Sequence, residues 1–414
     1  MEGLAIHAAT RAKTLAGILA LAAVLAAARP AAAYSVLAHE ANIDALWDSA
    51  IRPLLQQRFP ATTRQQLLDA RAYAYGGSVI QDLGYYPFGS RFFSNLLHYV
   101  RTGDFVETML RDARTVDEYA FALGAMAHYA ADNTGHPAAV NRAVALMYPK
   151  LRAKYGDSIT YAQARAQHVI VEFSFDIVQV AAGAYVPDSY HSFIGFQVAK
   201  PVLERAFRDT YGLEMADVFV DEDLAIATYR RAVSEILPEL TRAAWRDKRD
   251  EIARLVPSVT EERFVYRYTR RQFEKDFGTR YRKPGLFARF LGLVYRVLPK
   301  IGPLKPLSFK APTPEAEKLF NESLTQTRER YAASLSAAGA GRLNLVNTDF
   351  DTGRPSAHGE YPLADKTYAQ LLDKLKDRKQ DSVPTALRAD IKTFYSRGAP
   401  PKNVQKRLAA LGSR

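Results

Sequence analysis

The chain has 414 residues, of which 48% are hydrophobic and 24% are charged, and its formal net charge is +12. This composition excludes a disordered or fibrous protein, and the length suffices for one large domain with an appendage or for two domains. Cysteine is absent, which excludes disulfides and leaves His, Asp, Glu and backbone groups as metal ligands. The positive charge weakly favours anionic surroundings such as phospholipid head groups or nucleic acid.

Residues 1–33 have the features of a secretory signal peptide. Two basic residues precede an apolar run at residues 15–28, and residues 31–33 offer an Ala-x-Ala cleavage site. The run is shorter than the roughly 20 residues that span a bilayer, although an uncleaved anchor is the alternative. We therefore expect an exported protein, periplasmic or secreted and possibly peripheral on a membrane, whose mature chain begins at Tyr34.

Helical periodicity dominates the next part of the chain. Apolar residues recur at helical spacing between Asn42 and Phe59, and a capping box at Thr115 precedes a second periodic run that ends at Gly135. A further capping box at Thr160 opens a helix that continues to about Gly183. Strand-like alternation is scarce, so we expect an all-α fold, a multi-helix bundle.

Composition divides the chain into three parts after the signal peptide. We expect a catalytic domain at residues 34–255, a basic helical extension at residues 256–335, and a loosely ordered tail with short helices at residues 336–414. Within the extension, residues 286–298 mix apolar residues with arginines, as an interfacial helix does. A buried helix whose arginines reach to solvent fits this segment equally well.

Pairs of metal-ligand residue types recur at helical spacing. His128 and Asp132 are four residues apart on a predicted helix, so both project from one face, and His136 follows soon after. His168 and Glu172 repeat this spacing on a valine-rich helix, where an unpaired carboxylate is costly to bury. Each pair alone is more often a surface pair or a satisfied core pair than a metal site.

Taken in order with His39, Asp82 and His98, these residues resemble the zinc-dependent phospholipase C family. That family shares its helical fold and trinuclear zinc site with single-strand-specific nucleases, and its mature chains begin with an aromatic residue that binds zinc through its backbone. The resemblance implies three zinc ions with the following ligands: Asp82, His98, His128 and Asp132 for one; His136, His168 and Glu172 for a second; Tyr34, His39 and a bridging Asp132 for the third.

The resemblance also implies a phosphodiester hydrolase. The expected activity is that of a phospholipase C, in which a zinc-activated water releases diacylglycerol and a phosphorylated head group. The family assigns Asp82 a catalytic role, to orient or deprotonate that water in addition to binding zinc. The aromatic residues that follow favour a lipid, although core packing fits Phe92 and Phe93 slightly better.

Two alternatives remain open at this point. One is a nuclease or nucleotidase on the same scaffold, and the other is a non-catalytic exported protein that retains zinc for structure. We expect a phospholipid or membrane surface as the substrate, with nucleic acid less favoured and no protein partner inferred.

Overall fold

The computed structural model describes residues 36–182, 196–232, 248–250, 252–254, 309–376, 378, 383–397 and 400–412. The predicted signal peptide, Tyr34 and the predicted interfacial helix at residues 286–298 lie outside these residues. Within them the chain is helical, with one isolated antiparallel bridge between Asp349 and Arg354. The predicted all-α helical bundle is confirmed.

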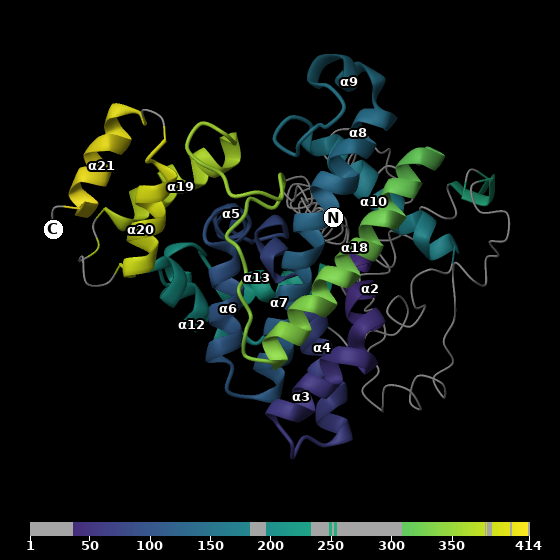
Figure 1. Ribbon diagram of the computed structural model, residues 1–414, viewed down its shortest axis with the longest axis horizontal. Coiled ribbons are helices and arrows are strands. Elements are labelled where there is room, and N and C mark those ends of the chain that lie inside the picture. Colours follow the sequence, from purple (N-terminus) through teal and green to yellow (C-terminus); the bar gives the residue numbers. More distant parts are fainter. Residues whose placement is uncertain are drawn as a thin grey trace, which may run out of the picture.

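The described helices extend from the N-terminal part to the end of the chain (Figure 1). In chain order the α-helices are α2 (Val36–Leu46), α3 (Arg52–Arg58), α4 (Arg64–Gly77), α5 (Arg91–Tyr99), α6 (Thr102–Asp112), α7 (Val116–Gly135), α8 (Asn141–Met147), α9 (Pro149–Tyr155), α10 (Arg165–Ala182), α12 (Lys200–Tyr211), α13 (Glu222–Arg231), α18 (Pro314–Gly339), α19 (Pro362–Leu375), α20 (Thr385–Phe394) and α21 (Lys402–Gly412). Short π-helical segments lie at Trp47–Ile51 and His136–Val140, and 3₁₀ turns lie at Ile80–Tyr85 and Met215–Asp217.

A side-chain cap begins α7, the helix at the centre of the fold. Thr115 accepts a hydrogen bond from the backbone N–H of Glu118 over 3.2 Å, so α7 starts where the sequence predicts. The Glu118 carboxylate accepts from the N–H of Arg114, one residue before the cap, instead of from Thr115. Gly135 ends the helix, and Pro137 lies in the first turn of the segment that follows, as predicted.

Helices α4 and α7 cross with their backbones in direct contact. A Cβ atom on Gly124 of α7 would lie 2.1 Å from the carbonyl oxygen of Ala74. One on Gly77 of α4 would lie 2.0 Å from the carbonyl oxygen of Phe121. Only glycine fits at both positions, and the crossing holds the middle of α7 against the end of α4.

Two apolar clusters form the described core. The larger joins α4 to α7 and α12 with residues of the C-terminal part, among them Leu345 and Ile391. The smaller is built from one side of α2 together with α8, α10 and α18. Helix α7 contributes Ala130 to the first and Ala131 to the second, so the helices that carry the predicted ligands lie where the clusters meet.

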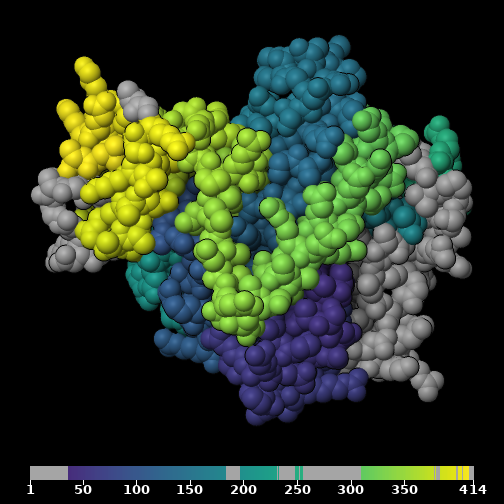
Figure 2. Space-filling model, viewed as in Figure 1, coloured from purple at the N-terminus to yellow at the C-terminus, as the bar shows by residue number. Residues whose placement is uncertain are grey.

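The C-terminal part of the chain returns over the helices of the N-terminal half (Figure 1). Helix α18 packs against α7 and α2, and α19 packs against α5. Figure 2 shows the segment that connects α18 to α19, in yellow-green, on the surface between α18 and the yellow C-terminal helices. Helices α19 and α20 lie in the tail, where the sequence predicts short helices.

The described part of residues 336–414 packs more closely than the loosely ordered tail that the sequence predicts. The reason is that its scattered leucine and aromatic side chains enter the larger apolar cluster. The domain limits themselves stay a prediction. Among the described residues, no helix is both long and apolar enough to cross a bilayer.

Candidate metal centre

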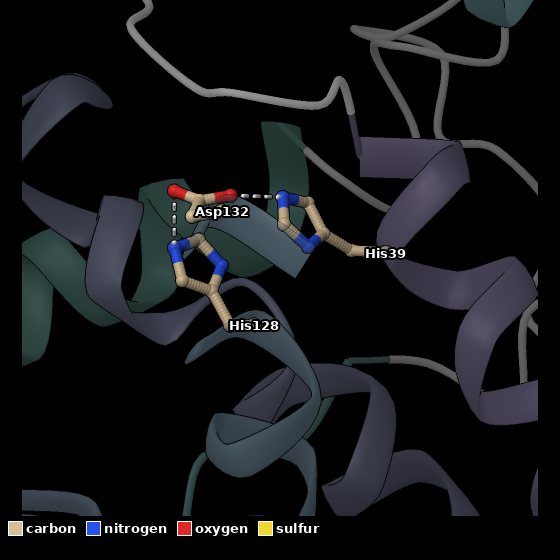
Figure 3. Close-up of side chains that lie close together, drawn as sticks. All are labelled: His39, His128 and Asp132. Carbon is tan, nitrogen blue, oxygen red and sulfur yellow. Dashed lines mark ion pairs between the residues drawn. The ribbon is translucent and has the colours of Figure 1, made fainter. Parts of the chain in front are cut away.

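Each carboxylate oxygen of Asp132 faces an imidazole ring from a different helix (Figure 3). Nε2 of His39, on α2, is 3.5 Å from Oδ1 of Asp132, and Nε2 of His128, one turn earlier on α7, is 3.1 Å from Oδ2. The two rings are stacked, with centroids 4.4 Å apart and an interplanar angle of 12°. All three side chains are buried, and their donor atoms lie within 4.8 Å of one another, close enough to share a metal ion.

Asp82 and His98 extend this group. Asp82 lies in the 3₁₀ turn after α4, and His98 lies in the last turn of α5. Nε2 of His98 is 3.3 Å from Oδ1 of Asp82 and 3.5 Å from Oδ2 of Asp132. The donor atoms of Asp82, His98 and His128 form a second set within 4.8 Å, so His128 takes part in both.

A third set joins α10 to the segment after α7. Nδ1 of His168 is 3.8 Å from Oε1 of Glu172, one turn later on α10. The ring centroid of His136 is 5.9 Å from that of His168. The donor atoms of these three residues also lie within 4.8 Å of one another. Gly135 and His136 both keep right-handed helical dihedral angles, so the chain continues from α7 into the π-helical segment, and His136 follows Asp132 by one helical turn.

Three of the histidines are oriented by backbone carbonyls. An imidazole N–H that donates to a carbonyl leaves the lone pair of the other nitrogen facing the carboxylates, which is the form that binds a metal. Each carbonyl oxygen lies within hydrogen-bonding distance of one ring nitrogen: Ser94 O is 2.7 Å from Nδ1 of His98, Ser78 O is 3.0 Å from Nδ1 of His128, and Ile159 O is 2.6 Å from Nε2 of His168.

Burial displaces the pKa values of the site. Burial lowers the pKa of His39 and of His168 to about 3, so both rings are neutral at neutral pH and able to act as ligands. Burial also acts to lower the pKa of His98, but its contacts with Asp132 and Asp82 outweigh this and raise it to about 10. The centre therefore holds both neutral donors and a ring whose proton a metal ion would replace.

The polar atoms of the site fit zinc better than they fit one another. Both carboxylate oxygens of Asp82 and of Asp132, and Oε1 of Glu172, are buried without a hydrogen bond among the described residues. Imidazole nitrogens lie 3.1–3.8 Å from Oδ1 of Asp82, from both oxygens of Asp132 and from Oε1 of Glu172, as two ligands of the same ion would. These contacts do not have the geometry of hydrogen bonds. Each such atom costs on the order of 1–3 kcal/mol when left unsatisfied. Zinc, which prefers imidazole nitrogen and carboxylate oxygen, offsets that cost.

A comparison with protein families identifies this part of the chain. Residues 44–219 match the family model for zinc-dependent phospholipase C. The match covers less than half of the chain and supports a likeness to this family over that segment. The predicted resemblance to this family is confirmed, and it supports a zinc-dependent hydrolase of the phospholipase C type at the level of the family. No curated protein and no solved structure matches the chain.

The matched residues 44–219 contain every predicted ligand except Tyr34 and His39, which precede them. The structure brings together every predicted ligand except Tyr34, which lies outside the described residues. The distribution of these ligands over individual ions, and the catalytic role of Asp82, stay predictions.

Side chains from far outside the phospholipase C segment also reach the site. We call residues 345–361 the C-terminal strap. The ring of Phe350 lies against those of His98 and His128, with centroids 5.2 and 6.0 Å away. Oδ1 of Asp351 is 3.3 Å from Nε2 of His136. Sequence reasoning missed both residues, because no spacing relates the strap to ligands about two hundred positions earlier.

The aromatic residues after Asp82 divide into core and surface. Phe93 is fully buried and stacks on Phe207, so the core-packing interpretation is correct for it. Tyr85 is buried with its ring centroid 5.9 Å from that of His98. Phe88 is 53% exposed and has a φ of +63°, in the left-handed region that bulky residues rarely adopt.

Proposed function

We propose that the protein is a zinc-dependent phospholipase C that cleaves a phospholipid between the diacylglycerol oxygen and phosphorus. The observation that carries this proposal is the convergence of five histidines and three carboxylates in one buried centre. They come from α2, α5, α7, α10, the turn at Asp82 and the π-helical segment that begins at His136. The match of residues 44–219 to the phospholipase C family supports the same reaction class.

The chain's own residues would bind and orient the reacting groups. Asp132, between His39 and His128, would bridge two ions, and the backbone carbonyls would hold the imidazole lone pairs toward them. When bound, zinc supplies Lewis-acid charge for the phosphate oxygens and lowers the pKa of water toward about 7. Asp82 would accept the proton of the attacking water or orient that water.

We propose three zinc ions, with the third held by His39, Asp132 and the amino and carbonyl groups of Tyr34. His39 lies in the first turns of α2, only five positions after Tyr34, which supports this arrangement. The proposal includes removal of the signal peptide and export, because Tyr34 offers its amine only as an N-terminus. An uncleaved chain should therefore hold one ion more weakly than the mature chain.

A lipid surface is the substrate that we favour over nucleic acid. The exposed ring of Phe88 lies six residues after Asp82, and a large apolar side chain in water favours contact with lipid. The net charge of +12 is compatible with either anionic substrate and does not discriminate.

The test uses the mature chain, residues 34–414, loaded with zinc. Zinc per chain is counted, and release of phosphocholine from phosphatidylcholine vesicles is compared with release of nucleotides from single-stranded DNA. We expect head-group release that a chelator abolishes and added zinc restores. Cleavage of DNA alone would assign the nuclease function, and bound zinc with neither reaction would assign the structural role.

A further inference from the structure

His136 differs from His98, His128 and His168 in the group that orients its imidazole ring. His98, His128 and His168 are each directed to a backbone carbonyl, whereas Nε2 of His136 faces the carboxylate of Asp351. Nδ1 of His136 is buried without a hydrogen bond among the described residues. A metal ion at Nε2 would leave an N–H at Nδ1 buried with no acceptor, which costs on the order of 1–3 kcal/mol. A metal ion at Nδ1 would leave both nitrogens satisfied.

The carboxylate of Asp351 is itself held in place. Its Oδ2 accepts hydrogen bonds from the hydroxyl of Tyr99, over 2.9 Å, and from the hydroxyl of Tyr361. Its backbone N–H donates to Oδ1 of Asp349 over 2.9 Å, and its backbone carbonyl accepts from the side chain of Asn141 over 2.8 Å. These bonds occupy one carboxylate oxygen and leave the other turned toward His136.

The strap that carries Asp351 is hydrogen-bonded to α5, which carries His98, and to the start of α6. Thr348 exchanges two hydrogen bonds with the hydroxyl of Thr102, at 2.9 and 3.0 Å. The backbone N–H of Phe350 donates to the carbonyl oxygen of His98 over 3.1 Å. The position of Asp351 is therefore set by contacts of the residues directly before it.

We propose that Asp351 is a positioning residue of the metal centre. It accepts the Nε2 proton of His136 and so holds Nδ1 toward the ion shared with His168 and Glu172. Asp351 lies outside the set of donor atoms that fit one ion, which agrees with a role through His136. Carboxylates in this relation to a zinc-bound histidine fix its tautomer and increase its basicity. This proposal rests on the zinc centre of the proposed function.

Zinc affinity of the mature chain tests this role. We compare wild type with Asp351→Ala and Asp351→Asn by competition with a chelator, and we count zinc per chain at equal free zinc. The expected result for Asp351→Ala is a loss of about 10- to 100-fold in affinity for one ion. Asp351→Asn should lie between the two, because its amide oxygen still accepts the Nε2 proton but is a poor zinc ligand.

A matched control comes from the same tail. Oδ1 of Asp365 lies 2.8 Å from Nδ1 of His358, a second histidine–aspartate pair away from the predicted ligands. Asp365→Ala should keep the zinc affinity of wild type. The melting temperature of each metal-free variant separates a loss of fold from a loss of affinity.

The zinc affinities of these variants decide whether Asp351 positions His136, binds zinc directly or only stabilises the fold. Equal zinc affinity of wild type and Asp351→Ala would overturn the positioning role, even if Asp351→Ala melts earlier. A loss as large in Asp351→Asn as in Asp351→Ala would also overturn it, in favour of direct ligation. Wild type that binds zinc but cleaves no phosphodiester would contradict the proposed function alone, because affinity is measured without substrate. A wild-type chain that binds no zinc would overturn both.

Discussion

The carbonyl oxygen of Ser78 lies 3.0 Å from Nδ1 of His128, so the residue that follows α4 orients a predicted ligand on α7. Ser78 directly follows Gly77, and His128 lies one turn after Gly124. The close helix crossing that these two glycines permit therefore brings the carbonyl to the ring. The metal centre depends on this backbone contact as well as on its ligands.

Gly124→Ala should disrupt both the crossing and the centre. Its methyl group would lie 2.1 Å from the carbonyl oxygen of Ala74, and backbone atoms cannot move away as a flexible side chain can. We expect a loss of about 1–3 kcal/mol in the free energy of unfolding, measured with urea on the metal-free chain, and weaker zinc binding. Gly339→Ala is the control, because its methyl group would meet the ends of the Leu54 and Gln57 side chains and no backbone atom of another segment. Equal losses in the two variants would contradict the argument.

His128→Ala should abolish hydrolysis. His128 belongs to two of the three donor sets, so its removal should weaken zinc binding by the centre. We expect activity at background and fewer zinc ions per chain, with the helical circular dichroism spectrum retained. His358→Ala, in the tail, should keep full activity. An unaffected rate in His128→Ala would refute the assignment of the centre.

Asp82→Asn should remove proton transfer from the attacking water while leaving the fold intact. The amide keeps the shape of the side chain but cannot take a proton from water, and general-base catalysis typically contributes 10²- to 10⁴-fold. We expect kcat to fall by about this factor with a much smaller change in KM. A variant with its full zinc content and the full rate would exclude the catalytic role.

Phe88→Asn should affect lipid surfaces selectively. Asparagine tolerates the φ of +63° at this position, so the change removes an exposed ring without adding backbone strain. We expect the rate on phosphatidylcholine vesicles to fall several-fold and the rate on a soluble phosphocholine ester to stay unchanged. Val346→Asn, which alters another exposed apolar residue, is the control. Equal losses on both substrates would show that Phe88 does not act at the lipid surface.

Asp390 predicts a pH dependence of stability. Burial raises its pKa to about 6, against about 3.9 in an unfolded chain, and Tyr368 donates to its Oδ2 over 2.8 Å. Because the folded chain binds the proton more tightly, the stabilisation is complete below about pH 4 and is lost as the pH rises through 6.

The variant Asp390→Asn imitates the protonated form. We expect it to be more stable than wild type by about 3 kcal/mol at about pH 7.5, and equally stable near pH 4. Urea unfolding of both proteins at the two pH values measures this. A difference in stability that stays constant between them would contradict the raised pKa.

The sequence predicts the helices and the ligand pairs because both follow from spacing along one helix. His128 with Asp132 and His168 with Glu172 lie together as their four-residue separation requires. The single helix expected between Asn42 and Phe59 is instead divided by a π-helical segment at Trp47–Ile51, an insertion that apolar periodicity does not reveal.

The contacts between distant segments could not be predicted. The stacking of His39 on His128, and the approach of Phe350 and Asp351, depend on how helices cross and how the tail returns. Neither arises from local periodicity. The resemblance supplied the grouping of the ligands, whereas the role of Asp351 became visible only in three dimensions.

The C-terminal strap has a consequence for the making of this protein. The predicted ligands leave the ribosome first, and Asp351 follows only after α18 has been synthesised. A chain that is halted or cut before residue 345 keeps every predicted ligand yet lacks the carboxylate that faces His136. How tightly the centre holds zinc thus becomes a measure of whether the chain is whole, and truncated products are marked by easier loss of metal.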